Sequence, residues 1–524
     1  MTSTRMRRSA AKAAPLLIAA AVVLSACAAG GGGSSKPDLE MAPVVTTHEE
    51  VTEPLTLAMD ARTATLDPLL VTSTHDVRLL KLIGGTLFEL SPDSSASVTP
   101  SLASDGELSE DGMQYTATLK GGATFTDGTP LTADDVVATF ERARTYEANA
   151  YLAQIAPVSA VEAVDDATVR FSFTRPYPSF ETFLAYPNMA ILKASEIGAD
   201  LAIPAVPTFA GAFAVEGDYF SNKFSLERYT DFVGSTPAVK TINVVIVTDA
   251  NSRIQQVRTG QVDFAVDPLP SQYSSLKGDA LPQITESVGF YYLNMNNKGD
   301  ITSDPNVRKA ISKAVDRAQL TSVITGGYAE PMSGFFPASF GPGNAGDVKK
   351  DVSAAKELLV GTACAEGCEL SLLVSQEWAQ QAGVVVQQNL AEIGITVSIE
   401  SAEPQVEIER LFAADFDLNV GLFGDYSTVP EGLPGYCMQY SAGYLSCLSS
   451  YESADAEAAV DDFTLALDET EKTSAMDQAT DIFLTDQPYA TISGLTAAAA
   501  VSKAATGVLS MGSTNLIHVA TLAE

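Results

Sequence analysis

Histidine is the side chain that most often carries acid–base or metal chemistry, and this chain has only three. His48, His75 and His518 lie far apart, and none belongs to an H-E-x-x-H or similar metal-ligand pattern. No G-x-S-x-G elbow or Walker-type loop occurs either. Acidic residues are abundant, but abundance alone does not bring two carboxylates within the roughly 5–10 Å that glycosidase chemistry needs. We therefore expect a protein that is not an enzyme and that holds neither a cofactor nor a metal.

One glycine-rich stretch imitates a nucleotide site. Residues 341–346, GPGNAG, match the dinucleotide pattern G-x-G-x-x-G letter for letter. That fingerprint needs a strand running directly into it, whereas the preceding EPMSGFFPASF carries Pro331 and Pro337. We interpret the stretch as a glycine-rich turn.

Cys27 stands between an apolar run and a glycine-rich segment. Four basic residues precede the apolar run 13–24, which is shorter than the roughly 20 residues of a membrane-spanning helix and is typical of a secretory signal. The segment LSAC, residues 24–27, resembles the lipobox of bacterial lipoproteins, in which the cysteine receives a diacylglycerol before cleavage. We therefore predict a signal peptide over 1–26, a lipid anchor on Cys27 and a flexible tether through residue 53. The alternative is a plain signal peptide with an incidental cysteine.

The other four cysteines form an even set, as expected in an oxidising compartment. Three pairings are possible, but the short spacings favour Cys364 with Cys368 and Cys437 with Cys447. The alternative, a metal cluster, is disfavoured because no histidine lies nearby. We predict two disulfides.

Length and charge exclude further classes. The chain has 524 residues, of which 46% are hydrophobic, enough for two or three domains' worth of buried core. It carries 65 acidic against 31 basic residues, a formal charge of −34, which would repel a phosphate backbone. Nucleic acid is therefore not an expected partner.

The elements that must position any site alternate between strands and helices. The stretch from Pro54 predicts a first strand that stops at Asp67-Pro68, after an extended linker over 36–53. Residues 114–120 alternate apolar and polar and predict a half-buried strand. A helix follows, with Thr132 as its cap and Asp135 completing a capping box.

The second half of the chain repeats this order. The stretch DPNVRKAISKAVDRAQL opens with Asp304 and Pro305 in cap and first-turn positions. Its apolar residues recur at helical spacing, at Val307, Ile311, Ala314 and Ala318. A later helix is stopped by Gly394 and runs into a strand over 395–399. The chain therefore reads as two or more α/β lobes without an internal repeat of fixed period.

Four of these segments carry a resemblance. TLDPL, YTATLKGGATFTDGTPLTADDVVATFERA, DPNVRKAISKAVDRAQL and NLAEIGITVSI occur in the order of the signature blocks of family 5 extracellular solute-binding proteins. The block F-x-D-G-x-P-L-T-A-D-D-V, at 125–136, is the most specific of them. The resemblance implies an α/β, two-lobed periplasmic-binding-protein-like fold of type II with an extra inserted α/β domain.

The family also implies an organisation and a role. We expect lobe I over 54–92, 205–287 and 490–524, an inserted subdomain over 93–204, and lobe II over 288–489. The family's members bind di- or oligopeptides between the lobes and deliver them to the membrane permease of an ABC importer. A monomer, anchored by lipid on the outer face of the cell membrane, is expected.

One predicted wall of the ligand site lies in GLFGDYSTVPEG. By resemblance, Asp425 pairs with the peptide's ammonium group, and Phe423, Gly424 and Tyr426 flank it. Such a charge-assisted bond is worth about 1.5–3 kcal/mol, roughly tenfold to more than a hundredfold in affinity. Alternatively, Asp425 only holds its loop as an Asx turn beside Tyr426.

The other predicted wall is TSTHD, with Ser73, Thr74 and His75 as ligand contacts. Their hydroxyl and amide groups could bond a ligand backbone, but Thr74 and Asp76 could equally cap the following helix.

Four residues outside these walls have side chains that could suggest a functional role. Trp378, near a helix start, is expected to pack rather than to stack on ligand. Arg308, Asp316 and Arg317 are expected to tie lobe II together.

Departures from the family pattern affect the substrate. Where members often carry G-T-G-P-F this chain has Phe209-Ala210-Gly211-Ala212-Phe213, and it lacks the tryptophan that often precedes the aspartate. A non-peptide solute, such as an oligosaccharide, an opine or a metal chelate, therefore stays open. A secreted hydrolase and a peptide sensor with another partner are further alternatives.

Overall fold

The computed structural model describes residues 39–44, 47–91, 97–335, 346–424, 437–438 and 448–523. The chain divides into two units, residues 1–35 and 36–524, and all described residues belong to the second. The predicted signal peptide, Cys27, Asp425, Tyr426 and Cys447 lie outside the described residues, as does most of the GPGNAG stretch.

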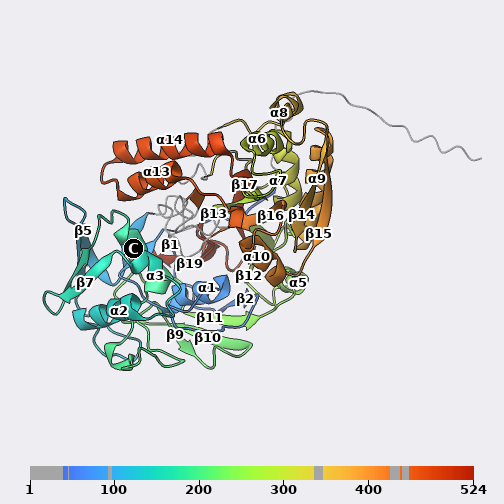
Figure 1. Ribbon diagram of the computed structural model, residues 1–524. Coiled ribbons are helices and arrows are strands. Elements are labelled where there is room, and N and C mark those ends of the chain that lie inside the picture. Colours follow the sequence, from blue (N-terminus) through green and yellow to red (C-terminus); the bar gives the residue numbers. More distant parts are fainter. Residues whose placement is uncertain are drawn as a thin grey trace, which may run out of the picture. The chain divides into compact units, whose positions relative to one another are not determined.

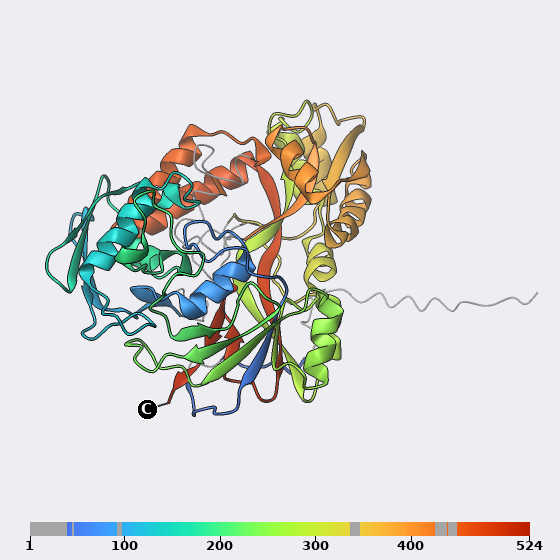
Figure 2. The same ribbon diagram turned by 90° about the horizontal axis from the view of Figure 1, so that it is seen from below.

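A ten-stranded sheet organises the described part of the chain (Figures 1 and 2). Its two longest strands, β13 and β17, are neighbours and run antiparallel. In sheet order the strands are β15 (Ile395–Ser401), β14 (Cys368–Val374), β16 (Leu418–Phe423), β13 (Ala280–Met295), β17 (Tyr489–Ser502), β12 (Phe264–Val266), β2 (Leu55–Met59), β11 (Thr241–Ile246), β10 (Lys223–Arg228) and β9 (Phe213–Glu216).

The two long strands belong to two halves of this sheet. Residues 280–287 of β13 pair with 495–502 of β17, which continues into β12 and the strands beyond it, here called the β2 half. Residues 290–294 pair with β17 on one side and residues 290–295 pair with β16 on the other, in what we call the β14 half. The register of β13 shifts between Ser287 and Phe290, where Gly289 adopts φ 134°. The halves therefore meet at an irregularity in β13.

Short helices accompany the β2 half and share its cores. They are α1 (Thr74–Ile83), α5 (Ala250–Arg258) and the 3-10 helix η3 (Pro270–Ser275). The last strands of the chain form two small two-stranded sheets. In one, β18 (Leu509–Met511) pairs with β19 (Ile517–Val519); in the other, β20 (Thr521–Leu522) pairs with β1 (Thr47–His48).

A second sheet has a hydrophobic core of its own, built around edge-to-face contacts of Phe171 with Phe140 and Phe180. Its strands, in order, are β5 (Ala103–Leu108), β6 (Gln114–Leu119), β8 (Thr168–Phe173) and β7 (Val158–Ala163). Around it lie β3 (Phe88–Leu90), β4 (Val98–Pro100), α2 (Ala133–Thr145), α3 (Leu152–Ile155), α4 (Phe180–Leu184), η1 (Pro187–Met189) and η2 (Ala194–Glu196).

The β14 half carries most of the longer helices. These are α6 (Pro305–Ala314), α7 (Arg317–Thr325), α8 (Val352–Leu359), α9 (Glu377–Ala391), α10 (Pro404–Phe412), α13 (Ala454–Leu465) and α14 (Glu469–Asp486). The last two pack side by side as a helical pair (Figure 1).

Several predicted elements are confirmed. The strand over 114–119 alternates buried and more exposed residues, and α2 starts after Thr132, whose N–H donates to the Asp135 carboxylate at 2.9 Å. Helix α9 ends before Gly394, which has φ 85°, and β15 follows it.

Three boundaries were predicted wrongly. The first strand ends at Met59, because the residues that follow turn toward the side chain of Asp76, to which Ala64 N–H donates. The helix that starts at Pro305 ends at Ala314, and Asp316 caps a new helix in which Ala318 is exposed. The linker is shorter than expected, because β1 pairs with β20 and Ala42 is buried in the core.

The structure contains the predicted Cys364–Cys368 disulfide. The second predicted disulfide is not formed, because Cys437 is a free, buried thiol within an apolar cluster; its predicted partner Cys447 lies outside the described residues.

None of the helices in the described ranges combines the length and apolar character that a membrane span requires. Nor do these residues gather three or more His, Cys, Asp or Glu side chains into a group able to hold a metal ion.

Candidate functional site

The β16 end of the predicted site is held against the irregularity in β13. Phe423, the last residue of β16, pairs with Phe290, the β13 residue at which the register with β17 shifts. A Cβ atom at Gly289 would lie 2.2 Å from Phe423 O and 2.8 Å from Gly424 Cα, so only glycine permits this approach. The segment leading into Asp425 and Tyr426, which lie outside the described residues, therefore starts where the two halves of the sheet meet.

The ring of Phe423 belongs to the core. It is 6% exposed and its centroid lies 5.8 Å from that of Phe290. Its neighbour Leu422, on the opposite face of the strand, is 39% exposed. The Phe423 side chain therefore packs in the core, and the exposed side chain at this end of β16 is that of Leu422.

The α1 end of the predicted site begins with a helix cap. Ser73 has extended backbone angles, and its hydroxyl accepts a hydrogen bond from Asp76 N at 3.1 Å. The cap is therefore Ser73, so the alternative in which Thr74 or Asp76 caps the helix is wrong. Burial raises the pKa of Asp76, whose carboxylate accepts hydrogen bonds from Ala64 N.

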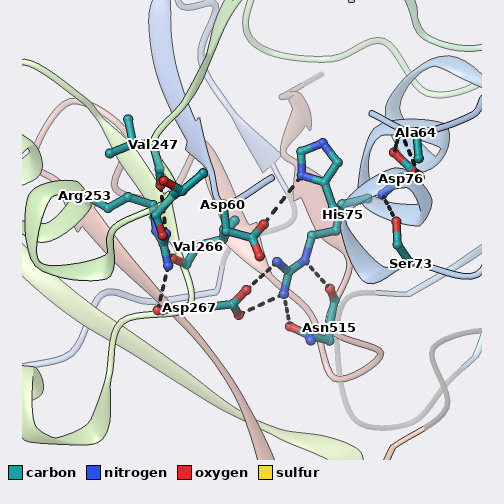
Figure 3. A network of polar contacts seen from close by, with 12 residues as sticks. Asp60, Ala64, Ser73, His75, Asp76, Val247, Arg253, Val266, Asp267 and Asn515 are labelled. Atoms are coloured by element: carbon teal, nitrogen blue, oxygen red, sulfur yellow. Dashed lines mark hydrogen bonds and ion pairs between the residues drawn. The ribbon is translucent and has the colours of Figure 1, made fainter. Parts of the chain in front are cut away.

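His75 faces the half-buried carboxylate of Asp60 (Figure 3). Its side chain is 4% exposed, and Nδ1 lies 3.5 Å from Oδ1 of Asp60, the residue directly after β2. The contact with His75, assisted by the charge of Arg78, outweighs burial and lowers the pKa of Asp60 to about 2.

Arg78 forms the centre of the same network. Its guanidinium donates to both carboxylate oxygens of Asp267, at 2.7 and 2.9 Å, and to the backbone and side-chain oxygens of Asn515. Both partners have left-handed backbones, with φ 52° and 58°. A second arginine, Arg253, donates to the carbonyls of Val266 and Asp267 and so holds the same segment (Figure 3).

Sequence reasoning missed Asp60, Arg78, Asp267 and Asn515. A signal for two of them was present: each aspartate directly follows an apolar strand, β2 or β12. These strands are parallel neighbours, so their carboxyl ends lie at the same edge of the sheet. Nothing in the sequence pointed to Asn515, which comes from the far end of the chain.

The residues expected to tie the β14 half together do so. Arg308 donates to the carbonyls of Asp486, Gln487, Thr302 and Ser303, and Asp316 caps α7 by accepting from Gln319 N.

Trp378 packs edge-on against Tyr291, with centroids 5.2 Å apart, in agreement with its predicted packing role.

Comparisons with known proteins agree with this architecture. The family described as "Bacterial extracellular solute-binding proteins, family 5 Middle" matches residues 97–443. The glutathione-binding protein GsiB of Salmonella choleraesuis is 29% identical over 361 residues, covering 66% of this chain and 69% of the relative. The probable D,D-dipeptide-binding periplasmic protein DdpA of Escherichia coli is 25% identical over 454 residues, covering 83% and 87%.

Solved structures share the fold. DppA from Helicobacter pylori, in complex with the peptide STSA, aligns with a TM-score of 0.74 at 20% identity, covering 90% of this chain and 98% of that one. NikA from Brucella suis, in complex with Fe(III)-EDTA, aligns with a TM-score of 0.78 at 20% identity, covering 89% and 100%.

The relatives are named as binding proteins, not as enzymes. Because the family match spans more than half of the chain, the protein belongs to family 5 of the bacterial extracellular solute-binding proteins, the substrate-binding components of ABC importers, and has their α/β fold of type II.

Proposed function

We propose that the protein captures di- or oligopeptides between its two lobes and delivers them unchanged to the permease of an ABC importer. Lobe I corresponds to the β2 half, with the four-stranded sheet as the inserted subdomain, and lobe II to the β14 half. A lipid on Cys27 holds the receptor at the outer face of the membrane; metabolic labelling with palmitate, lost in Cys27→Ala, tests the anchor.

The observation that carries this proposal is the meeting of Phe423 and Gly424 with Gly289 in β13. Strands β13 and β17 are shared by both halves of the sheet, so bending of one half against the other must involve the irregularity at 288–289. A ligand held by the residues after Gly424 would therefore bind next to the irregularity at which we propose that the halves bend. Its extra contacts would favour the closed form.

Asp425 is the proposed partner of the peptide's ammonium group, directly after the described end of this segment. A cation that leaves water for a closed cleft needs a carboxylate in return, because an unpaired buried charge is strongly disfavoured. The other proposed wall, at the start of α1, is the stretch Ser73, Thr74 and His75.

The names of similar proteins favour peptides. The two relatives described above are named for glutathione and for D,D-dipeptides, and DppA was solved with a tetrapeptide. Fe(III)-EDTA in NikA and agropinic acid in AgaA from A.tumefacien R10 show that the fold also accepts other solutes.

A double-mutant cycle, in which the peptide is N-acetylated and Asp425 is changed to Asn, tests whether Asp425 pairs with the peptide's ammonium group. Binding of one peptide and of its N-acetylated form would be measured by calorimetry with the wild type and with Asp425→Asn. We expect acetylation to weaken binding to the wild type by about tenfold to a hundredfold, and to change binding to the variant by less than about threefold.

The matched control is Asp231→Asn, an exposed aspartate that follows β10. It should discriminate between the two peptides as the wild type does. Equal discrimination by Asp425→Asn would overturn the role of Asp425, and no binding of either peptide to the wild type would overturn the peptide receptor.

A further inference from the structure

The β14 half contains a cavity of about 350 Å³ beside helices α6 and α7. This volume is at the lower end of the roughly 300–1,000 Å³ typical of small-molecule sites. None of Phe423, Gly424 or the α1 residues lines it. The cavity therefore lies apart from the described residues of the proposed peptide site.

Two lysines on one face of α6 line this cavity. Lys309 and Lys313 are four residues apart and thus lie one above the other on the helix surface. Both are half-buried, and neither forms an ion pair with any residue that the structure describes. Their ammonium groups are available to a ligand.

A buried guanidinium forms part of the same wall. Arg317 is 2% exposed and donates to the carbonyls of Met332, Thr491 and Ser312, and to the Ser312 hydroxyl. All these acceptors are neutral, and burial lowers the pKa of Arg317 to about 10. A buried charge without a carboxylate partner is costly, and an anion beside it removes part of that cost.

Negative charge around the cavity is scarce although the chain carries a formal charge of −34. Asp347, which is exposed, is the single acidic residue in the described lining. Three cationic side chains thus face one acidic side chain, an excess of positive charge in a strongly acidic protein.

We propose that this cavity binds a small anion carrying a phosphate or carboxylate group, with Lys309 and Lys313 as its charged contacts. The Ser312 hydroxyl, which accepts from Arg317, can donate its own proton to the same anion. Because the anion would bind the folded chain only, it would also stabilise the β14 half.

Calorimetric titration with inorganic phosphate and, separately, with citrate, at constant ionic strength, tests the proposal on the chain without its lipid anchor. We expect saturable binding of at least one anion to the wild type. The double variant Lys309→Gln/Lys313→Gln should bind it at least about tenfold more weakly, because two charge-assisted contacts are lost.

The control is Lys277→Gln/Lys356→Gln, which removes the same charge at two exposed lysines outside the cavity. It should bind the anion as the wild type does. Peptide affinity should be unchanged in both double variants, so failure here is distinguishable from failure of the proposed peptide role. Absence of saturable binding of both anions, or equal weakening in the two double variants, would overturn the proposal.

Discussion

The two predicted walls of the peptide site are built in opposite ways. At the start of α1, the polar side chains already have protein partners: Ser73 caps the helix, His75 faces Asp60, and Arg78 pairs with Asp267. At the end of β16, the defining contact is between backbone atoms and Gly289, and Asp425 follows directly. Hydrogen bonds and ion pairs between side chains therefore hold the first wall in place. The second wall lies where the two halves of the sheet meet, and it leads into Asp425, the proposed partner of the ligand's ammonium group.

The difference predicts that removing a side chain that already has a protein partner at the start of α1 lowers stability and leaves peptide affinity intact, whereas changes at the end of β16 alter affinity. Four substitutions separate the two outcomes.

The largest loss of stability is expected for Asp267→Ala. It leaves the guanidinium of Arg78, which is 1% exposed, without its carboxylate, and should lower the free energy of unfolding by about 2–3 kcal/mol. Urea denaturation against the exposed control Asp231→Ala measures it. A loss no greater than that of the control would show that the Arg78 pair does not hold this wall.

Gly289→Ala should affect both properties. The new Cβ would meet Phe423 O at 2.2 Å, at a backbone φ of 134°, so we expect about 1–3 kcal/mol of destabilisation and weaker peptide binding. Gly121→Ala is the matched control, since a Cβ there meets nothing within 4 Å. If peptide affinity stays at the wild-type value in Gly289→Ala, the β16 segment does not transmit binding to the sheet.

Ser73→Ala removes a helix cap and should cost about 1 kcal/mol, which Ser73→Thr should largely restore. Calorimetry with a peptide ligand should give the wild-type affinity for both variants. A loss of affinity in Ser73→Ala would instead make the hydroxyl a ligand contact.

The smallest effect concerns acid stability. The pKa of Asp60 is lowered from its usual 3.8 to about 2 in the folded protein, so its ionised form contributes stability above pH 4. This contribution is lost as the pH falls from about 4 to about 2. Thermal unfolding temperatures at pH 2 to 6 should fall less steeply for Asp60→Asn than for the wild type; identical slopes would contradict the contact with His75.

Local patterns in the sequence predicted local structure well. The Thr132 and Asp135 spacing, the Pro305 helix start and the stop at Gly394 each depend on neighbouring residues, and the structure confirms them. The sequence did not predict the break between α6 and α7, because apolar residues keep their helical spacing past Asp316, the cap of α7.

Long-range contacts were beyond the sequence. Arg78 meets Asp267 and Asn515, which are 189 and 437 residues away along the chain, and no local pattern encodes that meeting. The free thiol of Cys437 was missed as well, since the spacing of cysteines does not show whether one of them is buried in an apolar cluster. The lobe boundaries and the role of Asp425 stay predictions.

Native mass spectrometry of residues 37–524 mixed with peptides of two to nine residues tests the peptide receptor most directly. We predict one intact peptide per chain, of varied sequence, released with unchanged mass when the protein unfolds. Retention of no peptide, or release of cleaved fragments, would contradict it.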